Sequence, residues 1–248
     1  DLRKRRIMFE VLHRSAAVTV FQEEFLPRLV RMGIPRDRIH TIHQSVDFPA
    51  QERFDVRAAV GISRRTPVVL MLGGLRRVKR TAYAVAAIHR VRRRLGDVRL
   101  IVAGPVLEPE AGTVLQEILR AHPWVHPLGE VPRSRIRSLL DRCDVLLNTS
   151  ASESESNAVL EALSRGRIVI ARDIPGNAGL KIHAAGLLFR NRDELEHRLL
   201  DAFQEPGRSA PLRENARRLI ATLHRPAREK AAYAALYRGV LSAARSRH

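Results

Sequence analysis

Cysteine is almost absent from this chain of 248 residues, because Cys143 is its only representative. A lone cysteine cannot form an internal disulfide, and it is usually a small buried apolar side chain. Long apolar runs are missing too. The longest, such as PVVLML at 67–72, have the length of a core strand and fall far short of the ~20 residues of a membrane span. The basic start DLRKRR leads only into IMF before Glu10, so no secretory signal is predicted. We therefore expect a cytoplasmic protein.

Lysine and aromatic residues are scarce as well, which bears on the meaning of the net charge of +18. Of the 44 basic residues only four are lysine, and the arginines are spread through every segment. This skew is typical of a GC-rich, bacterial-like codon usage rather than of selection for phosphate contacts. At 4%, aromatic residues are also too few for stacking bases. We expect no specific nucleic-acid partner. Association of the basic surface with an anionic membrane, at its inner face, or with nucleic acid is a weaker alternative.

What the chain does have is a regular alternation of short apolar runs and longer amphipathic stretches. With 45% hydrophobic residues it can build an ordinary globular core. The apolar runs predict strands at 16–21, 39–43, 67–72, 98–104, 124–129, 144–149, 168–172 and 186–190. Helical patterns fall at 22–32, 80–95, 112–121, 133–142, 156–165 and 192–204, followed by two final helices near 210–222 and 226–244. Strands that alternate with helices predict an α/β fold with a Rossmann-like, doubly wound parallel sheet.

A polar stretch without periodicity, QSVDFPAQERFD at 44–55, divides the chain. The piece before it, residues 1–43, predicts a single βαβ unit, which is too small to bury both faces of its own strands. We therefore expect this piece to be the tail end of another domain, or to lean on the main α/β block.

The segment LGGLRRVKR at 72–80 joins the first strand of the main block to its helix. Ligands of open α/β sheets bind at the carboxyl ends of the strands, which is where this segment falls. Gly73 and Gly74 let backbone N–H groups approach an anion, and Arg76 and Lys79 are placed to neutralise a diphosphate. The alternative is a Gly-Gly turn before a solvated basic helix start. The segment matches neither the G-x-G-x-x-G nor the Walker pattern, which argues against dinucleotide and NTPase sites.

A second strand end, NTSASESESNAVLEAL at 148–163, contains two glutamates with seven residues between them. Glu153 falls in the loop and Glu161 about two turns into the following helix. A loop carboxylate beside a helix N-terminus can accept sugar hydroxyls, while the free N–H groups of the helix bind phosphate. The alternative is a helix cap, because Ser152 and Glu155 match the S-x-x-E capping box. A third strand end, ARDIPGNAG at 171–179, predicts by itself only a turn.

Other kinds of catalytic chemistry find little support in the sequence. His122 and His126 in HPWVH are interrupted by Pro123, so they do not share the helical face that a zinc pair needs. A Ser-His-Asp hydrolase would need a G-x-S-x-G elbow, which the sequence lacks. We expect no metal and no cofactor.

Taken in order, GGLRRVK, VAGP, NTSASESESNAVLEAL and ARDIPGN resemble the C-terminal half of retaining glycosyltransferases of family four, which have the GT-B fold. Within that family the motifs look most like those of glycosyltransferase-1-domain-containing proteins. The resemblance covers residues 10–205. It implies that residues 1–47 are a remnant of the N-terminal Rossmann domain with the interdomain segment. Residues 48–248 would be the C-terminal nucleotide-sugar-binding domain, with helix 226–248 packing back on the remnant.

The resemblance also implies roles for individual residues. The E-x7-E motif of the family falls on Glu153, which would contact the donor sugar, and on Glu161, which would hold the ribose hydroxyls. Lys79 matches the lysine that binds the diphosphate and stabilises the leaving group. Backbone amides would meet the sugar and the diphosphate at Glu155, Ser156 and Asn157. The loop that holds the base would include Leu128, Gly129 and Val131.

Three departures from the family pattern stand out. Gly74 stands where an arginine commonly follows the first glycine, and Arg76 is our substitute for that arginine. Ser154 stands where a glycine usually follows the first glutamate. The N-terminal domain, which supplies the acceptor site in this family, is missing apart from its last βαβ unit.

We therefore expect a hexosyltransferase that uses a nucleoside-diphosphate sugar as donor and retains the anomeric configuration. The main chemical device would be electrostatic stabilisation of the leaving diphosphate by Lys79 and Arg76. The acceptor, whether glycan, lipid or small molecule, stays open, as does the activity of this chain without the missing domain. The alternative is a nucleotide-sugar-binding or interaction module without turnover.

Overall fold

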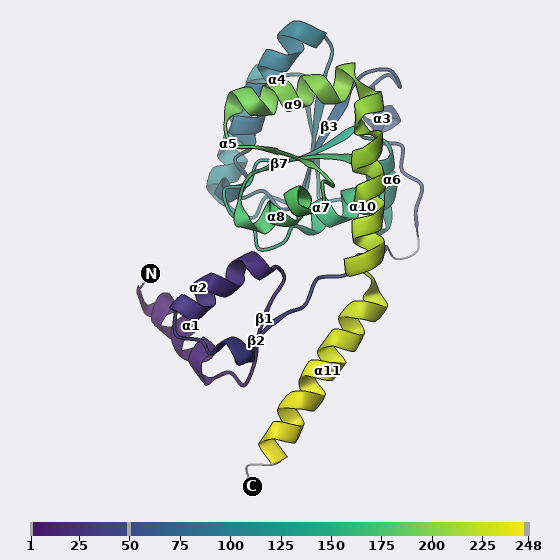
Figure 1. Ribbon diagram of the computed structural model, residues 1–248. Coiled ribbons are helices and arrows are strands. Elements are labelled where there is room, and N and C mark those ends of the chain that lie inside the picture. The colour runs from purple at the N-terminus through teal and green to yellow at the C-terminus, as the bar shows by residue number, and fades with distance from the viewer. Residues whose placement is uncertain (1, 49–50, 246–248) are drawn as a thin grey trace. The chain divides into compact units, whose positions relative to one another are not determined.

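The computed structural model describes residues 2–48 and 51–245 (Figure 1). The chain falls into two compact units, which we describe separately. Unit 1 comprises residues 1–45 and 223–248, and unit 2 comprises residues 46–222. The division expected from the sequence lies between residues 47 and 48 instead, and it counts the last helix with the larger domain.

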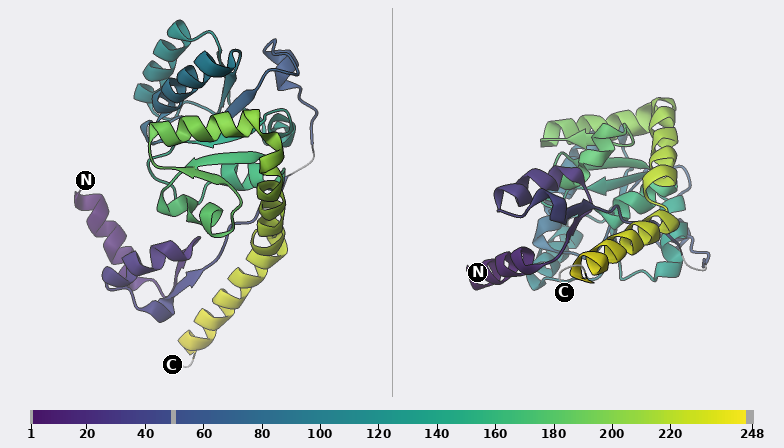
Figure 2. Two further views of the ribbon diagram at one scale, coloured as in Figure 1. Left: turned by 45° about the horizontal axis from the view of Figure 1, so that its top comes forward. Right: turned by 60° about the horizontal axis from the view of Figure 1, so that its bottom comes forward.

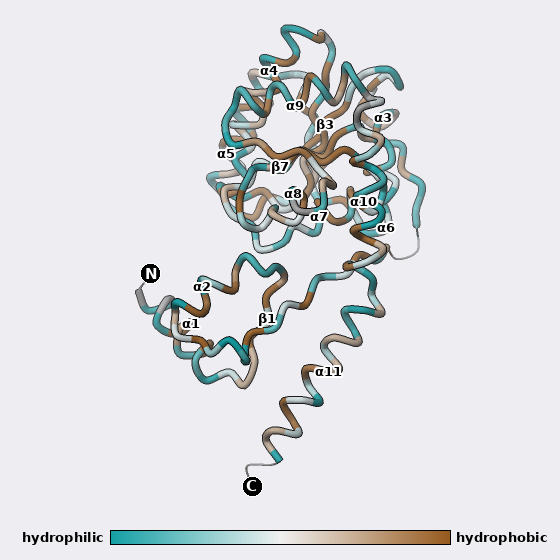
Figure 3. Tube along the Cα trace, viewed as in Figure 1, coloured by the Kyte–Doolittle hydropathy of each residue, from teal (hydrophilic) through white to brown (hydrophobic). Residues whose placement is uncertain are grey.

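Unit 2 is built on a parallel sheet of six strands in the order β5-β4-β3-β6-β7-β8. The strands are β3 (Val68–Leu72), β4 (Arg99–Ala103), β5 (Val125–Gly129), β6 (Val145–Asn148), β7 (Ile168–Arg172) and β8 (Leu187–Phe189). The apolar strands form the hydrophobic centre of the unit (Figure 3). Since β4 and β5 extend to one side of β3 and the later strands to the other, the order reverses between β3 and β6. In doubly wound sheets such a reversal opens a crevice at the carboxyl ends of the strands.

Helices cover both faces of this sheet (Figures 1 and 2). They are α3 (Val56–Ala59), α4 (Thr81–Leu95), α5 (Pro109–Ala121), α6 (Arg133–Asp141), α7 (Asn157–Ser164), α8 (Ala178–Ile182), α9 (Arg192–Gln204) and α10 (Ala210–Leu223). The apolar stripe of α4, with Val85, Ile88 and Val91, is buried in one core with Leu195 and Leu199 of α9. Helices α7 and α8 lie on the opposite face of the sheet from α4 and α9 (Figure 1).

The predicted α/β fold with its doubly wound parallel sheet is confirmed, and all eight predicted strands are present. The helix predicted at 22–32 is a 3-10 turn (Glu23–Phe25) followed by α2 (Leu26–Arg31), which begins with Pro27 in its first turn. Helix α1 (Leu2–Arg14) was not predicted, because its apolar residues Ile7, Met8 and Val11 are mostly exposed and no core selects their spacing. The short helices α3 and α8 were not predicted either.

Unit 1 holds two parallel strands, β1 (Val18–Val20) and β2 (Ile39–Thr41), with Val18 opposite Ile39. Its small core consists of Val18, Ile34 and Ile39. The last helix, α11 (Pro226–Arg245), also belongs to this unit, and none of its described side chains is fully buried.

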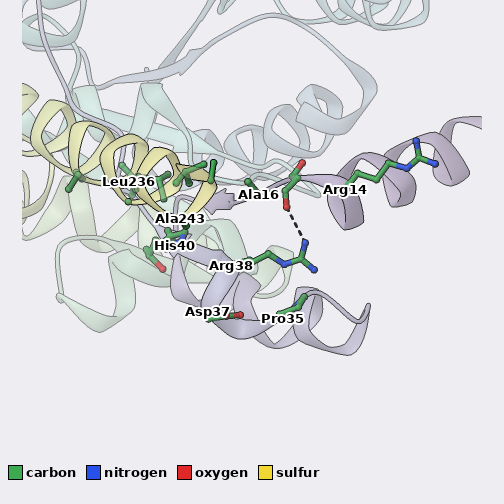
Figure 4. A pocket seen from close by; sticks show the side chains of 16 residues that line it. Arg14, Ala16, Pro35, Asp37, Arg38, His40, Leu236 and Ala243 are labelled. Carbon is green, nitrogen blue, oxygen red and sulfur yellow. Dashed lines mark hydrogen bonds between the residues drawn. The ribbon is translucent and has the colours of Figure 1, made fainter. Parts of the chain in front are cut away.

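A groove of about 970 Å³ runs between α11 and the strand segment of unit 1 (Figure 4). From α11 it is lined by apolar side chains that include Leu236 and Val240, whereas Leu241 is 60% exposed. On the other wall Arg38 donates from Nη1 to the carbonyl oxygen of Ser15 at 3.2 Å (Figure 4). Within the described residues, no helix combines the length and the apolarity that crossing a bilayer requires.

Candidate functional site

The predicted site residues of unit 2 come from the segments that follow β3, β5 and β6, at the carboxyl edge of the sheet. Strands β3 and β6 are the neighbours at which the strand order reverses. Because the carboxyl ends of parallel strands meet at one edge, segments far apart in the sequence come together there.

Gly73 makes the tight turn that leaves β3. Its φ of +126° is a conformation that side-chain-bearing residues rarely adopt, and its N–H donates to Ala103 at the end of β4 at 2.8 Å. The neighbouring loops are in backbone contact as well, since a Cβ on Gly104 would lie 2.2 Å from the Gly73 carbonyl oxygen. The turn therefore sets the path of the next residues toward Lys79.

Gly74 and Arg76 mark the departure from the family pattern. A Cβ on Gly74 would lie 2.3 Å from a methyl carbon of Leu107, so any side chain at this position requires Leu107 to move. The Arg76 side chain is exposed and makes no hydrogen bond or ion pair with other described residues. The proposed substitution of Arg76 for the family arginine stays a prediction.

Lys79 and Glu153 are in direct contact. Lys79 ends a 3-10 turn (Arg77–Lys79), and its Nζ donates to Glu153 Oε1 at 2.6 Å. The two side chains are 24% and 15% exposed, so the pair is only partly solvated. The loop after β6 also grips the lysine segment, since Thr149 Oγ1 donates to the Lys79 carbonyl oxygen at 2.6 Å. The structure thus brings together two predicted site residues that lie 74 positions apart.

The same carboxylate oxygen of Glu153 receives two further hydrogen bonds. Ser150 Oγ donates to Oε1 at 2.7 Å, and Asn148 Nδ2 lies 3.4 Å from it. Both side chains are buried. Among the described residues, no hydrogen bond reaches the second oxygen, Oε2. Glu153 is therefore held through one carboxylate oxygen, while the other makes no hydrogen bond to the described residues.

Gly176, in the turn that follows β7, packs directly against the backbone of Glu153. A Cβ on Gly176 would lie 2.2 Å from the Glu153 carbonyl oxygen and 2.6 Å from its carbonyl carbon. The segment ARDIPGN, which by sequence predicts only a turn, therefore fixes the position of the Glu153 backbone.

Glu161 lies on α7, and its side chain is only 6% exposed. Its partner is Arg133, the first residue of α6, whose Nη1 donates to Glu161 Oε1. Burial raises the pKa of Glu161, and the hydrogen bond and positive charge of Arg133 act in the opposite direction. Sequence reasoning missed Arg133. The only signal available was a basic residue at the start of the helix after the predicted base-binding loop.

Helix α7 begins at Asn157, with Ser156 as its N-cap residue. The capping box considered as the alternative at Ser152 and Glu155 does not form, because the helix begins several residues later. The Ser156 side chain makes no capping hydrogen bond. The first N–H groups of a helix lack intrahelical partners, and such groups can bind an anion. Glu155 is half-buried and Asn157 is exposed beside these groups.

The predicted base-binding residues lie at and just after the end of β5. Leu128 and Gly129 are its last two residues, and Val131 follows in the loop before α6. The Gly129 carbonyl oxygen accepts a hydrogen bond from the Gly104 N–H at 2.7 Å, which ties this loop to the end of β4. Leu128 and Val131 are half-buried.

The remaining candidates lie outside this constellation. Cys143 is buried, and burial raises the pKa of its thiol to about 12. Burial lowers the pKa of both His122 and His126. Within the described part of the chain, neither histidine belongs to a cluster of three side chains that could hold a metal ion.

Comparison with known proteins shows which family and fold the chain resembles. Residues 52–219 match the family model described as glycosyl transferases group 1. The chain is 28% identical over 230 residues to glycosyltransferase 1 domain-containing protein 1 of Xenopus tropicalis, which covers 89% of this chain and 66% of that protein. It is 28% identical over 167 residues to alpha-maltose-1-phosphate synthase of Mycolicibacterium smegmatis, which covers 59% of this chain and 42% of the synthase.

Solved structures share the fold. The chain superposes on sucrose-phosphate synthase of Thermosynechococcus elongatus with a TM-score of 0.84 at 18% identity, which covers 98% of this chain and 63% of the synthase. It superposes on Anabaena HepE in complex with UDP and glucose with a TM-score of 0.82 at 19% identity, which covers 98% of this chain and 68% of HepE. The chain therefore spans about two thirds or less of the length of the curated relatives that it matches.

Proposed function

The chain belongs to the glycosyl transferases group 1 family, and from this premise we propose that it binds a nucleoside-diphosphate sugar as the donor for hexosyl transfer. The contact between Lys79 and Glu153 carries the proposal, because it puts a cation for a diphosphate beside a carboxylate for sugar hydroxyls. The relatives support it, since one is a maltose-1-phosphate synthase and a structural neighbour holds UDP and glucose.

Each part of the donor has a matching group at the edge of the sheet. Glu161 would accept hydrogen bonds from the ribose hydroxyls, and Glu153 Oε2 would accept them from the sugar. Lys79, Arg76 and the first N–H groups of α7 would hold the diphosphate. The base would lie against the loop that begins at Leu128.

In the proposed transfer, the bond between the anomeric carbon and the diphosphate oxygen breaks, and its electron pair leaves with the diphosphate. The oxygen of an acceptor hydroxyl forms the new bond on the same face of the sugar, and its proton passes to the departing diphosphate. Lys79 and the start of α7 stabilise the negative charge that develops on the leaving group. Fixed charges of this kind act most strongly where water is excluded.

Unit 1 bears on how much of the reaction this chain performs. Its described residues form only two strands, and the chain spans 66% of the Xenopus relative. We therefore expect these 248 residues to bind the donor without transferring its sugar unaided. The same observation favours the second candidate function, a nucleotide-sugar-binding module without turnover.

Isothermal titration of the chain with UDP-glucose, ADP-glucose and GDP-mannose, at low and at high salt, tests the proposal. We expect binding that depends on the base and changes little with salt. Absence of binding, or uptake of every polyanion in a salt-sensitive way, would contradict it. Product formation with added acceptor hydroxyls then separates an enzyme from a binding module. Robust transfer by this chain alone contradicts the expectation that it binds the donor without transferring the sugar.

A further inference from the structure

The guanidinium of Arg133 joins three segments of unit 2. Nη1 donates to Glu161 on α7, and Nη2 donates to the carbonyl oxygen of Asp47 at 2.8 Å. The guanidinium carbon lies 5.7 Å from the centre of the Phe48 ring. The arginine side chain is 51% exposed and the glutamate side chain 6% exposed, so Arg133 lies between the carboxylate and solvent.

The position of Arg133 in α6 does not stabilise the helix. It is the first residue of the helix, where the helix dipole disfavours a positive charge, and the first turn contains no acidic residue. The N-cap residue, Pro132, provides no side-chain hydrogen bond that would offset this cost. The contacts that Arg133 does make are those with Glu161 and with residues 47–48.

The two hydroxyls of a ribose donate hydrogen bonds, so their binding site must offer acceptors. An ionised carboxylate offers acceptors only, whereas a protonated carboxyl group also carries a donor. Arg133 occupies one acceptor position of Glu161 Oε1, and the other positions of an ionised carboxylate stay available. The arginine therefore does not need to leave for a ribose to bind. It instead opposes protonation of a carboxylate that burial alone would leave neutral over a wider pH range.

We propose that Arg133 is a positioning residue of the nucleotide site, which holds Glu161 as a fixed, ionised acceptor for the two vicinal hydroxyls of a ribose. This inference rests on the proposed function and deepens it. The site then distinguishes ribonucleoside diphosphates from their 2′-deoxy analogues through Arg133 as well as through Glu161.

Few other charges can substitute for Arg133. Arg165, just after α7, is engaged with Asp141 at 2.9 and 3.0 Å. On α6, Arg135 is paired with Glu52, and neither it nor Arg137 is among the groups that shift the pKa of Glu161. The strands that pack against α7 are apolar up to their last residues, Asn148 and Arg172. Residues 46–48 provide no second cation. They contact Arg133 through the Asp47 carbonyl oxygen and the Phe48 ring, and their one charged side chain is the Asp47 carboxylate. Removal of Arg133 therefore leaves Glu161 without its neighbouring cation, and the pKa of Glu161 rises further.

The chain contains a matched control two residues along the same helix. Arg135 pairs with the carboxylate of Glu52 and lies 5.5 Å from the centre of the Phe54 ring. The set combines the same three kinds of side chain on residues outside the proposed nucleotide site, with a carboxylate that is 47% exposed instead of buried. Arg135→Ala therefore reports what loss of such a set costs when no ligand group is involved.

The test measures the affinity of UDP and 2′-deoxy-UDP, and of ADP and 2′-deoxy-ADP, across the pH range from mildly acidic to mildly basic. We expect the wild-type chain to prefer the ribose form of one pair throughout, by about tenfold, the effect of one hydrogen bond to a charged group. In Arg133→Ala this preference should shrink at acidic pH, where Glu161 is neutral, and recover as the pH rises. Arg133→Lys should keep most of the preference, and Arg135→Ala should match the wild type.

A second measurement uses Glu161→Gln, which removes the charge and keeps the shape. If Arg133 acts through the charge of Glu161, Arg133→Ala costs no further affinity in the Glu161→Gln background. An equal cost in both backgrounds, or an unchanged ribose preference of folded Arg133→Ala at every pH, overturns the inference. If Arg133→Ala does not fold, Arg133→Lys is the deciding variant. A weakened ribose preference in Arg133→Lys, with the same pH dependence as in the wild type, then overturns the inference. A wild-type chain that binds none of the four nucleotides refutes the proposed function itself.

Discussion

Gly176→Ala is the sharpest perturbation of the site that the structure offers, because the added methyl group points at the backbone of Glu153. The Cβ would lie 2.2 Å from the Glu153 carbonyl oxygen, and neither group is a flexible side-chain end that can turn aside. The Glu153 segment must therefore move by about 1 Å, a displacement that takes a hydrogen bond of normal length out of its range. The contacts of Glu153 Oε1 with Lys79 and Ser150, at 2.6 and 2.7 Å, leave little room for such a shift.

We expect Gly176→Ala to weaken binding of a nucleotide sugar by about tenfold or more, the effect of losing one hydrogen bond to a charged group. Binding of the nucleoside diphosphate should weaken less, because in the proposed complex the sugar meets Glu153 directly and the diphosphate meets it only through Lys79. Isothermal titration with UDP-glucose and UDP measures both. Gly179→Ala is the control, since a Cβ on Gly179, three residues later, would meet nothing within 4 Å. A folded Gly176→Ala chain with the affinities of Gly179→Ala would refute the role assigned to the Glu153 segment.

Three further predictions concern charge and burial. Lys79→Ala, and Arg76→Ala if Arg76 replaces the family arginine, should weaken binding of a nucleoside diphosphate far more than binding of the bare nucleoside; equal losses in titrations with both ligands would contradict a phosphate contact. Arg57→Ala should lower the free energy of unfolding by about 3 kcal/mol, because its buried guanidinium donates to three backbone carbonyls and to Asp144 at 2.7–2.9 Å; urea unfolding measures this, and a change below about 1 kcal/mol would contradict it. Cys143, with a pKa raised to about 12 by burial, should react with iodoacetamide at pH 8 only after unfolding, and rapid alkylation of the native chain, followed by mass spectrometry, would be the contrary result.

The central strands β3, β4, β6 and β7 could be predicted because each is an apolar run that the sheet buries on both faces. Residues 168–172 illustrate this: the sequence predicts a strand over that range, and β7 has those bounds. Segments that are too short to show a period, or whose apolar residues are not buried in a core, were missed. The five residues of α8 are too few for a helical period, and the apolar residues of α1 are mostly exposed.

The candidate site could be predicted only where one local motif carries it. Glu153 and Glu161 share a motif, and Lys79 follows the glycine turn. Arg133 could not be found in this way, because it lies 28 positions before Glu161 and only the packing of α6 beside α7 brings them together. The capping box failed for the related reason that a four-residue pattern matched at Ser152, whereas the helix starts where α7 packs on the sheet.

The single oxygen shared by Lys79, Ser150 and Asn148 has a consequence for how the donor preference of such a protein can change. If Glu153 binds the sugar as proposed, a substitution there that admits a different sugar also removes the partner of Lys79. Under the proposed role of Lys79, selection for a new sugar then alters the stabilisation of the leaving group at the same step. Changes of sugar preference should accordingly arise more readily at residues that border Oε2 than at Glu153 itself, because only those leave the grip on the diphosphate intact.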